Sequence, residues 1–147
     1  MTVRELIRRK RSDVITVHLG TGVPAAANLL IEHGIGGVPV VSPDGSVVGF
    51  VSERDIVRAV TRNGGVIRDV IVDRIMRRPA PVCSADDSLL DVMTRLTRDR
   101  MRHLVVLDAG TIAGVISVGD LVKHRLEQLE TETGILRDYV AAKRASI

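Results

Sequence analysis

Apolar and polar residues follow one pattern twice along the chain. Short, nearly continuous apolar segments are typical of buried strands, whereas apolar residues at helical spacing predict amphipathic helices. In the first half the pattern predicts a strand at 14–17, a helix at about 23–33, and the strands "GVPVV" and "SVVGFV". A further stretch of helical period follows Ser52. The first half is therefore predicted to fold as β-α-β-β-α.

The second half repeats this order. A strand is predicted at 81–83 and a helix at about 87–99. The strands "HLVVL" and "IAGVI" follow, and a helical pattern begins after Ser117. Both halves therefore predict the same β-α-β-β-α unit.

Tight turns are expected inside each half, because the connections "SPDG" and "DAGT" carry the Asp and Gly that hairpins need. One copy of about 50 residues would leave much of its sheet uncovered. We therefore predict an α/β (α+β) fold of two β-α-β-β-α repeats packed sheet to sheet with pseudo-twofold symmetry.

The flanking segments complete the predicted division of the chain. Thr2 and Glu5 have the spacing of a capping box at the start of an N-terminal helix, and "DVIVDRIM" predicts a short helix between the repeats. The predicted parts are repeat 1 with its N-terminal helix at 1–62, a linker with the short helix at 63–80, repeat 2 at 81–127 and a C-terminal helix at 128–147.

The C-terminal segment has a stripe of apolar or small residues spaced four, three, four, three and four. Gly134 weakens a helix there by about 1 kcal/mol relative to Ala. The stripe is expected to dock on the chain's own surface or on a second subunit. Its members are Val122, Leu126, Leu129, Thr133, Leu136 and Val140.

Composition narrows the class of protein. The 147 residues suit one compact domain, and with 45% apolar but 1% aromatic residues the core must consist of Val, Ile, Leu and Ala. The formal charge is +3, with basic clusters at 8–11, 76–78 and 98–102 that suit anionic partners. Nucleic acid is not expected as a partner, since Phe50 and Tyr139 are the only aromatic residues on which bases could stack.

The expected localisation and activity follow from features that are rare or not found in the sequence, namely cysteines, long apolar runs and catalytic or metal-binding motifs. Cys83 is the single cysteine, which fits a reducing compartment, and no apolar run reaches the roughly 20 residues of a membrane span, so we expect a cytoplasmic protein. No catalytic motif or metal-ligand spacing is found, and we expect neither an enzyme nor a metal site. Cys83 is expected to be a small buried residue, and Asp86, Asp87 and Asp91 to cap a helix.

Each repeat carries Ser-x-x-Asp directly after a strand, as Ser52 with Asp55 and Ser117 with Asp120. One interpretation is purely structural: the serine caps the helix and the aspartate complements its dipole. The other is functional. A carboxylate can accept both hydroxyls of a ribose, while the helix N-terminus attracts a phosphate.

These elements resemble a tandem pair of cystathionine β-synthase (CBS) domains, also called a Bateman module. The resemblance covers roughly residues 1–127 and is carried by "GIGGVPVVSPDGSVVGFVSERDIV" and "MRHLVVLDAGTIAGVISVGDLV". It implies two clefts that bind adenosyl ligands such as AMP, ADP, ATP or S-adenosylmethionine, with no obligatory cofactor. The resemblance further implies that each cleft takes residues from both repeats.

Carried over position by position, the resemblance makes the two clefts unequal. The second cleft, which contains Ser52 and Asp55, is expected to bind more weakly. Val82 there has no hydroxyl, and Arg102 with His103 replaces the two glycines of the first cleft. Arg102 and His103 could instead reach phosphates, assisted by Arg54 and Lys123. The first cleft would combine Thr16, Gly36, Gly37, Val38, Ser117 and Asp120. The second would combine Ser52, Asp55, Val82, Arg102, His103 and Leu104.

The resemblance implies a non-enzymatic sensor that acts through a homodimer on a separate regulated protein. The alternatives are a constitutive interaction scaffold with vestigial clefts and a nucleic-acid-binding regulator. The dimer is expected because the helices carry apolar residues that cannot all face one core. These residues are Val57, Val60, Val92, Leu96 and Leu121.

Overall fold

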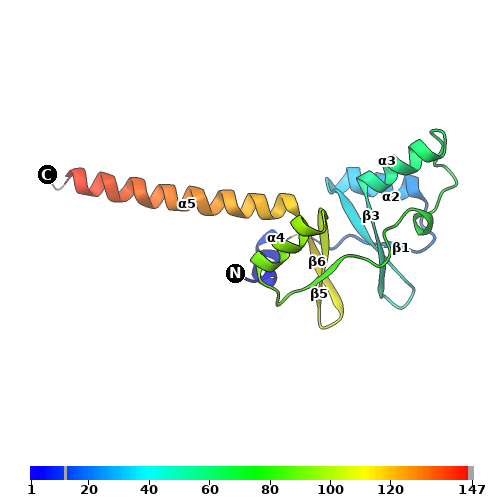
Figure 1. Ribbon diagram of the computed structural model, residues 1–147, viewed down its shortest axis with the longest axis horizontal. Helices are drawn as coiled ribbons and strands as arrows, with labels where there is room; N and C mark the ends of the chain where they lie inside the picture. The colour runs from blue at the N-terminus through cyan, green and yellow to red at the C-terminus, as the bar shows by residue number, and fades with distance from the viewer. Residues whose placement is uncertain (12, 146–147) are drawn as a thin grey trace.

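The structure is a computed structural model that describes residues 1–11 and 13–145. Two similar units follow one another along the chain (Figure 1). A helix, α1 (Val3–Lys10), precedes them, and a short 3-10 helix, η1 (Val72–Arg74), lies between them. Repeat 1 comprises β1 (Val17–His18), α2 (Val23–His33), β2 (Gly37–Val41), β3 (Val47–Ser52) and α3 (Glu53–Arg62). Repeat 2 comprises β4 (Val82–Ser84), α4 (Leu89–Arg98), β5 (His103–Asp108), β6 (Thr111–Ser117) and α5 (Val118–Ala145).

Each repeat contains a three-stranded sheet with the same topology. The orders are β1-β2-β3 and β4-β5-β6, in which the first pair is parallel and the second is an antiparallel hairpin. The predicted first strand of repeat 1 is shorter than expected and begins at Val17, which pairs with Val40. One residue earlier, Thr16 comes opposite Pro39, which has no N–H to donate to the ladder.

The two sheets pack against each other, which confirms the predicted fold class. A cluster between them contains the buried Phe50 of β3 and Val105 of β5, together with Ala80 of the linker. Two further clusters lie between each sheet and its helices, around Val38 and Ala26 in repeat 1 and around Leu104 and Val92 in repeat 2. Aliphatic side chains dominate all three cores, as the composition predicts.

Helix α1 packs on repeat 2, although the sequence groups it with repeat 1 (Figure 1). The Val3 N–H donates to the Asp87 carbonyl at 2.9 Å, and the Val3 and Leu6 side chains lie in the core of repeat 2. Ile7 fits over Gly114, where an added Cβ would come within 2.7 Å of it. Helix α1 precedes repeat 1 in the sequence. It therefore crosses over to repeat 2 and completes the core of that repeat.

The linker completes repeat 1 in the equivalent way. The Val72 N–H donates to the Thr21 carbonyl at 2.8 Å, and the Val72 side chain is fully buried in the core of repeat 1. Of the helix predicted in "DVIVDRIM", only the single turn of η1 is formed. Gly49 permits this packing, since a Cβ there would come within 2.5 Å of the Met76 sulfur.

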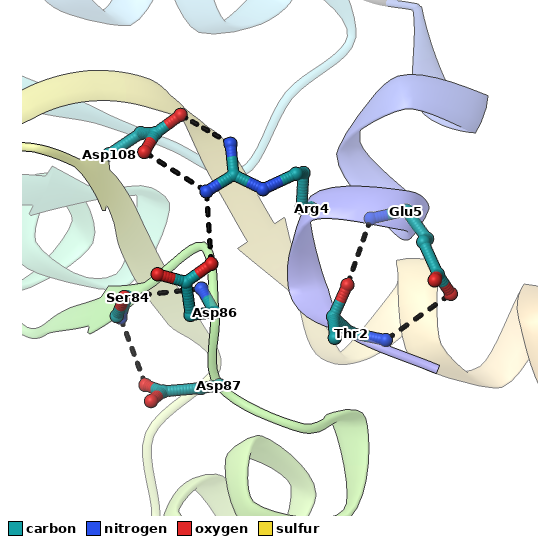
Figure 2. A network of polar contacts seen from close by, with 7 residues as sticks. All are labelled: Thr2, Arg4, Glu5, Ser84, Asp86, Asp87 and Asp108. Carbon is teal, nitrogen blue, oxygen red and sulfur yellow. Dashed lines mark hydrogen bonds and ion pairs between the residues drawn. The ribbon is translucent and has the colours of Figure 1, made fainter.

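Polar contacts fasten α1 to repeat 2 (Figure 2). The Arg4 guanidinium donates to both Asp108 carboxylate oxygens and to Asp86 Oδ1, and its hydrogen bond lowers the pKa of the Asp108 carboxyl. The predicted capping box between Thr2 and Glu5 is confirmed. Arg4 is therefore the main polar link between α1 and the body of repeat 2.

The capping prediction for the three aspartates of repeat 2 is partly wrong. Ser88 is the side-chain cap of α4, and it accepts from the Asp91 N–H at 3.1 Å in the first turn. Asp87 instead accepts from the Ser84 N–H at 2.9 Å, and Asp86 pairs with Arg4. The contact with Ser84 holds the Asp87 carboxylate away from the N-terminal end of α4, and the contact with Arg4 of α1 does the same for Asp86.

Helix α5 is continuous for 28 residues and extends away from both repeats (Figure 1). The second helix of repeat 2 and the predicted C-terminal helix therefore form one element, which passes through Gly134. The five apolar helix residues on which the dimer expectation rests do not all face one core. Val92, Leu96 and Leu121 lie in the core of repeat 2, whereas Val57 is 63% exposed.

Candidate functional site

One groove of about 1700 Å³ runs between the two repeats. The N-terminal ends of α3 and α5 and the segments before β2 and β5 form its walls. It joins into a single space what the sequence predicts as two clefts. The predicted residues that line it are Gly36, Gly37, Ser52, Arg54, Asp55, Arg102, His103, Ser117, Asp120 and Lys123.

Four predicted residues do not line the groove. Val38 and Leu104 are fully buried, each in the core of its own repeat. Thr16 is half-buried and Val82 is 37% exposed, but both lie outside the groove wall. The alternation of side chains along a strand explains the first pair, because a residue next to a groove-facing position points to the opposite face.

Both Ser-x-x-Asp elements cap a helix. In repeat 1 the Ser52 N–H donates to Asp55 Oδ2 at 2.9 Å, and the Asp55 N–H donates to Ser52 Oγ at 3.3 Å. In repeat 2 the Ser117 N–H donates to Asp120 Oδ2 at 2.9 Å, and the Asp120 N–H donates to Ser117 Oγ at 3.1 Å. The structural interpretation is therefore correct for both repeats.

Capping occupies only one oxygen of each carboxylate. In the part of the chain that the structure describes, no hydrogen bond reaches Asp120 Oδ1, and Asp55 Oδ1 lies 4.0 Å from the Arg58 Nη1 atom. Both carboxylates line the groove while mostly buried, with side chains 22% and 18% exposed. The cap fixes each carboxylate in place and leaves its second oxygen for a further donor.

Lys10 makes the two ends of the groove different. Its ammonium, at the end of α1, donates to Asp120 Oδ2 and to the Val115 carbonyl, both at 2.9 Å. Burial disfavours the charged form of Asp120, but the hydrogen bonds from Lys10 and Ser117 outweigh it and lower the pKa of the carboxyl. Asp120 is thus held ionised beside a cation.

A glycine in repeat 1 and a histidine in repeat 2 face the middle of the groove. A Cβ on Gly37 would come within 2.5 Å of the Phe50 ring, so that only glycine fits beneath it. The ring of His103 lies 5.2 Å from that of Phe50 and borders Gly36. Burial, followed by the charge of Lys10, lowers the pKa of His103, which favours the neutral imidazole at neutral pH.

The groove is strongly cationic. Its described lining includes nine Lys or Arg residues but four Asp or Glu residues. Six of these cations are not among the predicted site residues, because they come from α1, the far part of α3, the linker and the turn after α4. Lys10, Arg77 and Arg100 belong to the three basic clusters of the sequence, whereas Arg58, Arg62 and Arg74 do not.

The remaining sequence expectations concern metal-binding groups, membrane-spanning helices and the single cysteine. Among them, no cluster of His, Cys, Asp or Glu has the arrangement of a metal site. Within residues 1–11 and 13–145, no helix combines the length and the hydropathy of a bilayer-spanning segment. Cys83 is buried as predicted, and burial, with the nearby Asp87 charge, raises the pKa of its thiol to about 11.

Comparison with known proteins agrees with this architecture. The CBS-domain containing protein ATU1752 from Agrobacterium tumefaciens is 37% identical, has a TM-score of 0.78, and the match covers 84% of this chain and 98% of that one. The CBS domain pair of protein MJ0100, crystallised with 5'-methylthioadenosine and S-adenosylmethionine, matches with a TM-score of 0.78 over 87% of this chain and 98% of that one. At 22% identity, this second likeness shows the fold alone.

A longer relative shares only part of its length with the chain. Protein MJ1225 of Methanocaldococcus jannaschii is 26% identical over 121 residues, which are 82% of this chain and 41% of that protein. The family profile of the CBS domain matches twice, at residues 3–62 and 67–127. The chain therefore belongs to the CBS domain family, of which it contains a tandem pair.

Proposed function

We propose that this CBS pair is a non-enzymatic regulatory module that binds an adenosyl ligand in the groove between its repeats. The observation that carries the proposal is the pair of capped carboxylates, Asp55 and Asp120, at the walls of one cationic groove. A fixed carboxylate can accept both hydroxyls of a ribose. The N-terminal ends of α3 and α5 attract a phosphate placed beside it.

An adenine nucleotide fits this groove better than S-adenosylmethionine. The complex of MJ0100 with S-adenosylmethionine and 5'-methylthioadenosine supports the adenosyl class in general. The excess of Lys and Arg in the lining favours a ligand with phosphates over one with a sulfonium cation. We therefore rank AMP, ADP and ATP before S-adenosylmethionine as the regulatory ligand.

The two halves of the groove are proposed to bind unequally. In the Asp120 half, Ser117 and Asp120 would hold the ribose, Gly36 and Gly37 would leave room for the base, and Lys123 would approach the phosphates. Thr16 and Val38 could take part only through small rearrangement or through backbone groups, since neither lines the groove.

The Asp55 half is proposed to be the weaker one. Ser52 and Asp55 would hold the ribose there, with Arg54 and Arg102 near the phosphates. His103 brings a ring where repeat 1 has Gly37, and its lowered pKa makes it a neutral hydrogen-bonding group rather than a phosphate cation. Val82 and Leu104 offer no polar side chain to this half.

Ligand occupancy is proposed to act on a separate regulated protein through a homodimer. Both halves of the groove take atoms from both repeats, so that a ligand bound there couples the repeats. The first turn of helix α5, which contains Asp120, lines the groove, and the rest of the helix extends away from both repeats. Helix α5 is therefore the element through which occupancy would reach a partner.

Calorimetric titration of the wild-type protein tests the proposal. AMP, ATP, S-adenosylmethionine and an RNA oligomer should each be titrated at low and at moderate salt. We expect saturable binding of AMP or ATP that survives the higher salt. Binding of RNA alone, with a steep loss as salt rises, would indicate the nucleic-acid regulator. No binding of any ligand would indicate the scaffold.

A further inference from the structure

Helix α5 has an exposed apolar face along most of its length. From Arg125 to Thr133 every residue is exposed. The apolar stripe is exposed at Val122 (52%), Leu126 (56%), Leu129 (41%) and Val140 (41%). Most helical stability in proteins comes from tertiary packing of an apolar face, so a long helix with this face in water calls for a partner.

The stripe has the spacing of a coiled coil. When Leu126 is placed at position a of a heptad, Leu129 and Leu136 fall at d, and Thr133 and Val140 fall at a. Leu at d combined with β-branched residues at a favours two parallel strands. This arrangement of Thr133 and Val140 at a with two leucines at d points to a dimer rather than a larger bundle.

The charges beside the stripe select the partner and its direction. In a parallel, in-register pair, each g residue lies near the e residue five positions later in the other helix. Arg125 at g then meets Glu130 of the partner subunit, and Glu132 at g meets Arg137 of the partner subunit. All four side chains are exposed. Each pair is attractive and occurs twice by symmetry.

We propose that α5 binds α5 of a second copy of this chain as a parallel, in-register, two-stranded coiled coil. An antiparallel pair with the stripe fully overlapped brings like charges together. It places Glu130 beside Glu130 of the partner subunit and Glu132 beside Glu132 of the partner subunit. The same pair places Lys123 beside Arg137 of the partner subunit. The parallel pair satisfies the apolar stripe and these charges at once.

This inference specifies the interface of the homodimer in the proposed function. The parallel pair would place two copies of repeat 2 side by side at the N-terminal end of the coil, because both α5 helices begin at their grooves. The residues substituted to test the coil, at positions 132 to 140, lie more than three helical turns after Asp120. The coiled coil and the ligand site can therefore fail independently in experiments.

Cysteine cross-linking of the full chain tests the direction of the pair. In the parallel coil, Val140→Cys places two thiols across the a layer, within the 4.4–6.8 Å between Cα atoms that a disulfide needs. In the overlapped antiparallel pair they are roughly 27 Å apart at 1.5 Å per residue. Asp138→Cys is the matched control, since it lies at the outward f position of the same turn.

We expect Val140→Cys to form a disulfide-linked dimer at low micromolar protein under mild oxidation, whereas Asp138→Cys stays largely monomeric on a non-reducing gel. Equal cross-linking of the two variants, or none in either, would overturn the proposal. Nucleotide titration of the same variants shows separately whether the ligand site is intact. The buried Cys83, with its raised pKa, should not interfere.

A charge swap gives a second test, read by sedimentation equilibrium of the full chain. Glu132→Arg should weaken the dimer on the order of tenfold. In the parallel pair, each new Arg would lie beside Arg137 of the partner subunit, so that two attractive pairs become repulsive. Adding Arg137→Glu should restore it in a parallel pair. In the antiparallel pair, Glu132→Arg only replaces one like-charge pair by another and should not weaken the dimer, while Arg137→Glu would strengthen it by placing Glu beside Lys123 of the partner subunit. Failure of the second substitution to rescue the first would contradict the parallel coil.

Discussion

The Lys10 ammonium donates a 2.9 Å hydrogen bond to the Asp120 carboxylate, across 110 residues of sequence. This contact exists because α1 crosses to repeat 2, and it brings a cation of the N-terminal helix to the proposed ribose site. Two consequences follow, one for the choice of ligand and one for stability.

Lys10→Met should change the preference among ligands. The substitution removes a cation from the groove, which weakens ATP, and it removes the competitor for Asp120, which favours adenosine. The ratio of ATP affinity to adenosine affinity should fall by about twofold to fivefold, the range for partly exposed ion pairs. Calorimetry with both ligands measures it. Arg9→Met, on the exposed face of α1 outside the groove, is the control and should leave the ratio unchanged.

The lowered pKa of Asp120 predicts acid sensitivity. A carboxyl whose pKa is lower in the folded state stabilises the fold above its unfolded pKa of about 3.9. This stabilisation is lost as pH falls through the folded value, so the free energy of unfolding should decrease below about pH 4. Urea unfolding at several pH values measures this. Lys10→Met should flatten the dependence. An unchanged slope in that variant would argue against the ion pair in solution.

Gly37→Ala should destabilise the protein by about 1–3 kcal/mol, the usual cost of overpacking. The new Cβ would come within 2.5 Å of the Phe50 ring and 2.9 Å of the Val51 carbonyl oxygen. Gly119→Ala is the control, because its Cβ would meet only Ser117 Oγ, at 3.5 Å. Thermal unfolding of both variants without ligand is sufficient. Equal stability of the two would show that the Phe50 ring is free to move aside.

Cys83 should react slowly with alkylating agents in the native protein. Its thiol is buried and has a pKa of about 11, so that little thiolate is present at pH 8. Mass spectrometry should find Cys83 unmodified under conditions that label it completely in urea. Rapid labelling of native protein would mean that the edge of repeat 2 opens readily.

The repeat architecture could be predicted from the sequence because each element carries a local signal. The apolar strands, the Asp-Gly turns and the serine caps all depend on neighbours within a few residues. The crossing of α1 to repeat 2 depends on Val3, Leu6 and Ile7 meeting a surface that forms only in the folded protein. No local pattern distinguishes that surface from its counterpart in repeat 1.

The groove was predictable in outline for the same reason. Ser52, Asp55, Ser117 and Asp120 stand out because they repeat, but Lys10 reaches the groove only through the crossing of α1. Ser88 and Asp91 form a further Ser-x-x-Asp, which caps α4 outside the groove and shows that the spacing alone does not mark a ligand site. Whether a Ser-x-x-Asp motif lies at the proposed ligand site depends on where the fold places it.

The central claim is that Asp120 binds the ligand's ribose, and the Ser88–Asp91 motif provides its control. Asp120→Ala, Asp55→Ala and Asp91→Ala each change the same position of a serine-capped helix, but only Asp120 and Asp55 accept from the N–H of their capping serine, so Asp91→Ala should cost the least stability. Calorimetric titration with AMP and ATP should show a loss of about 1.5 to 3 kcal/mol of affinity for Asp120→Ala, the range for hydrogen bonds to a charged group. Asp55→Ala should lose less, and Asp91→Ala nothing. Affinity that is unchanged in Asp120→Ala, or lost equally in Asp91→Ala, would contradict the proposed site.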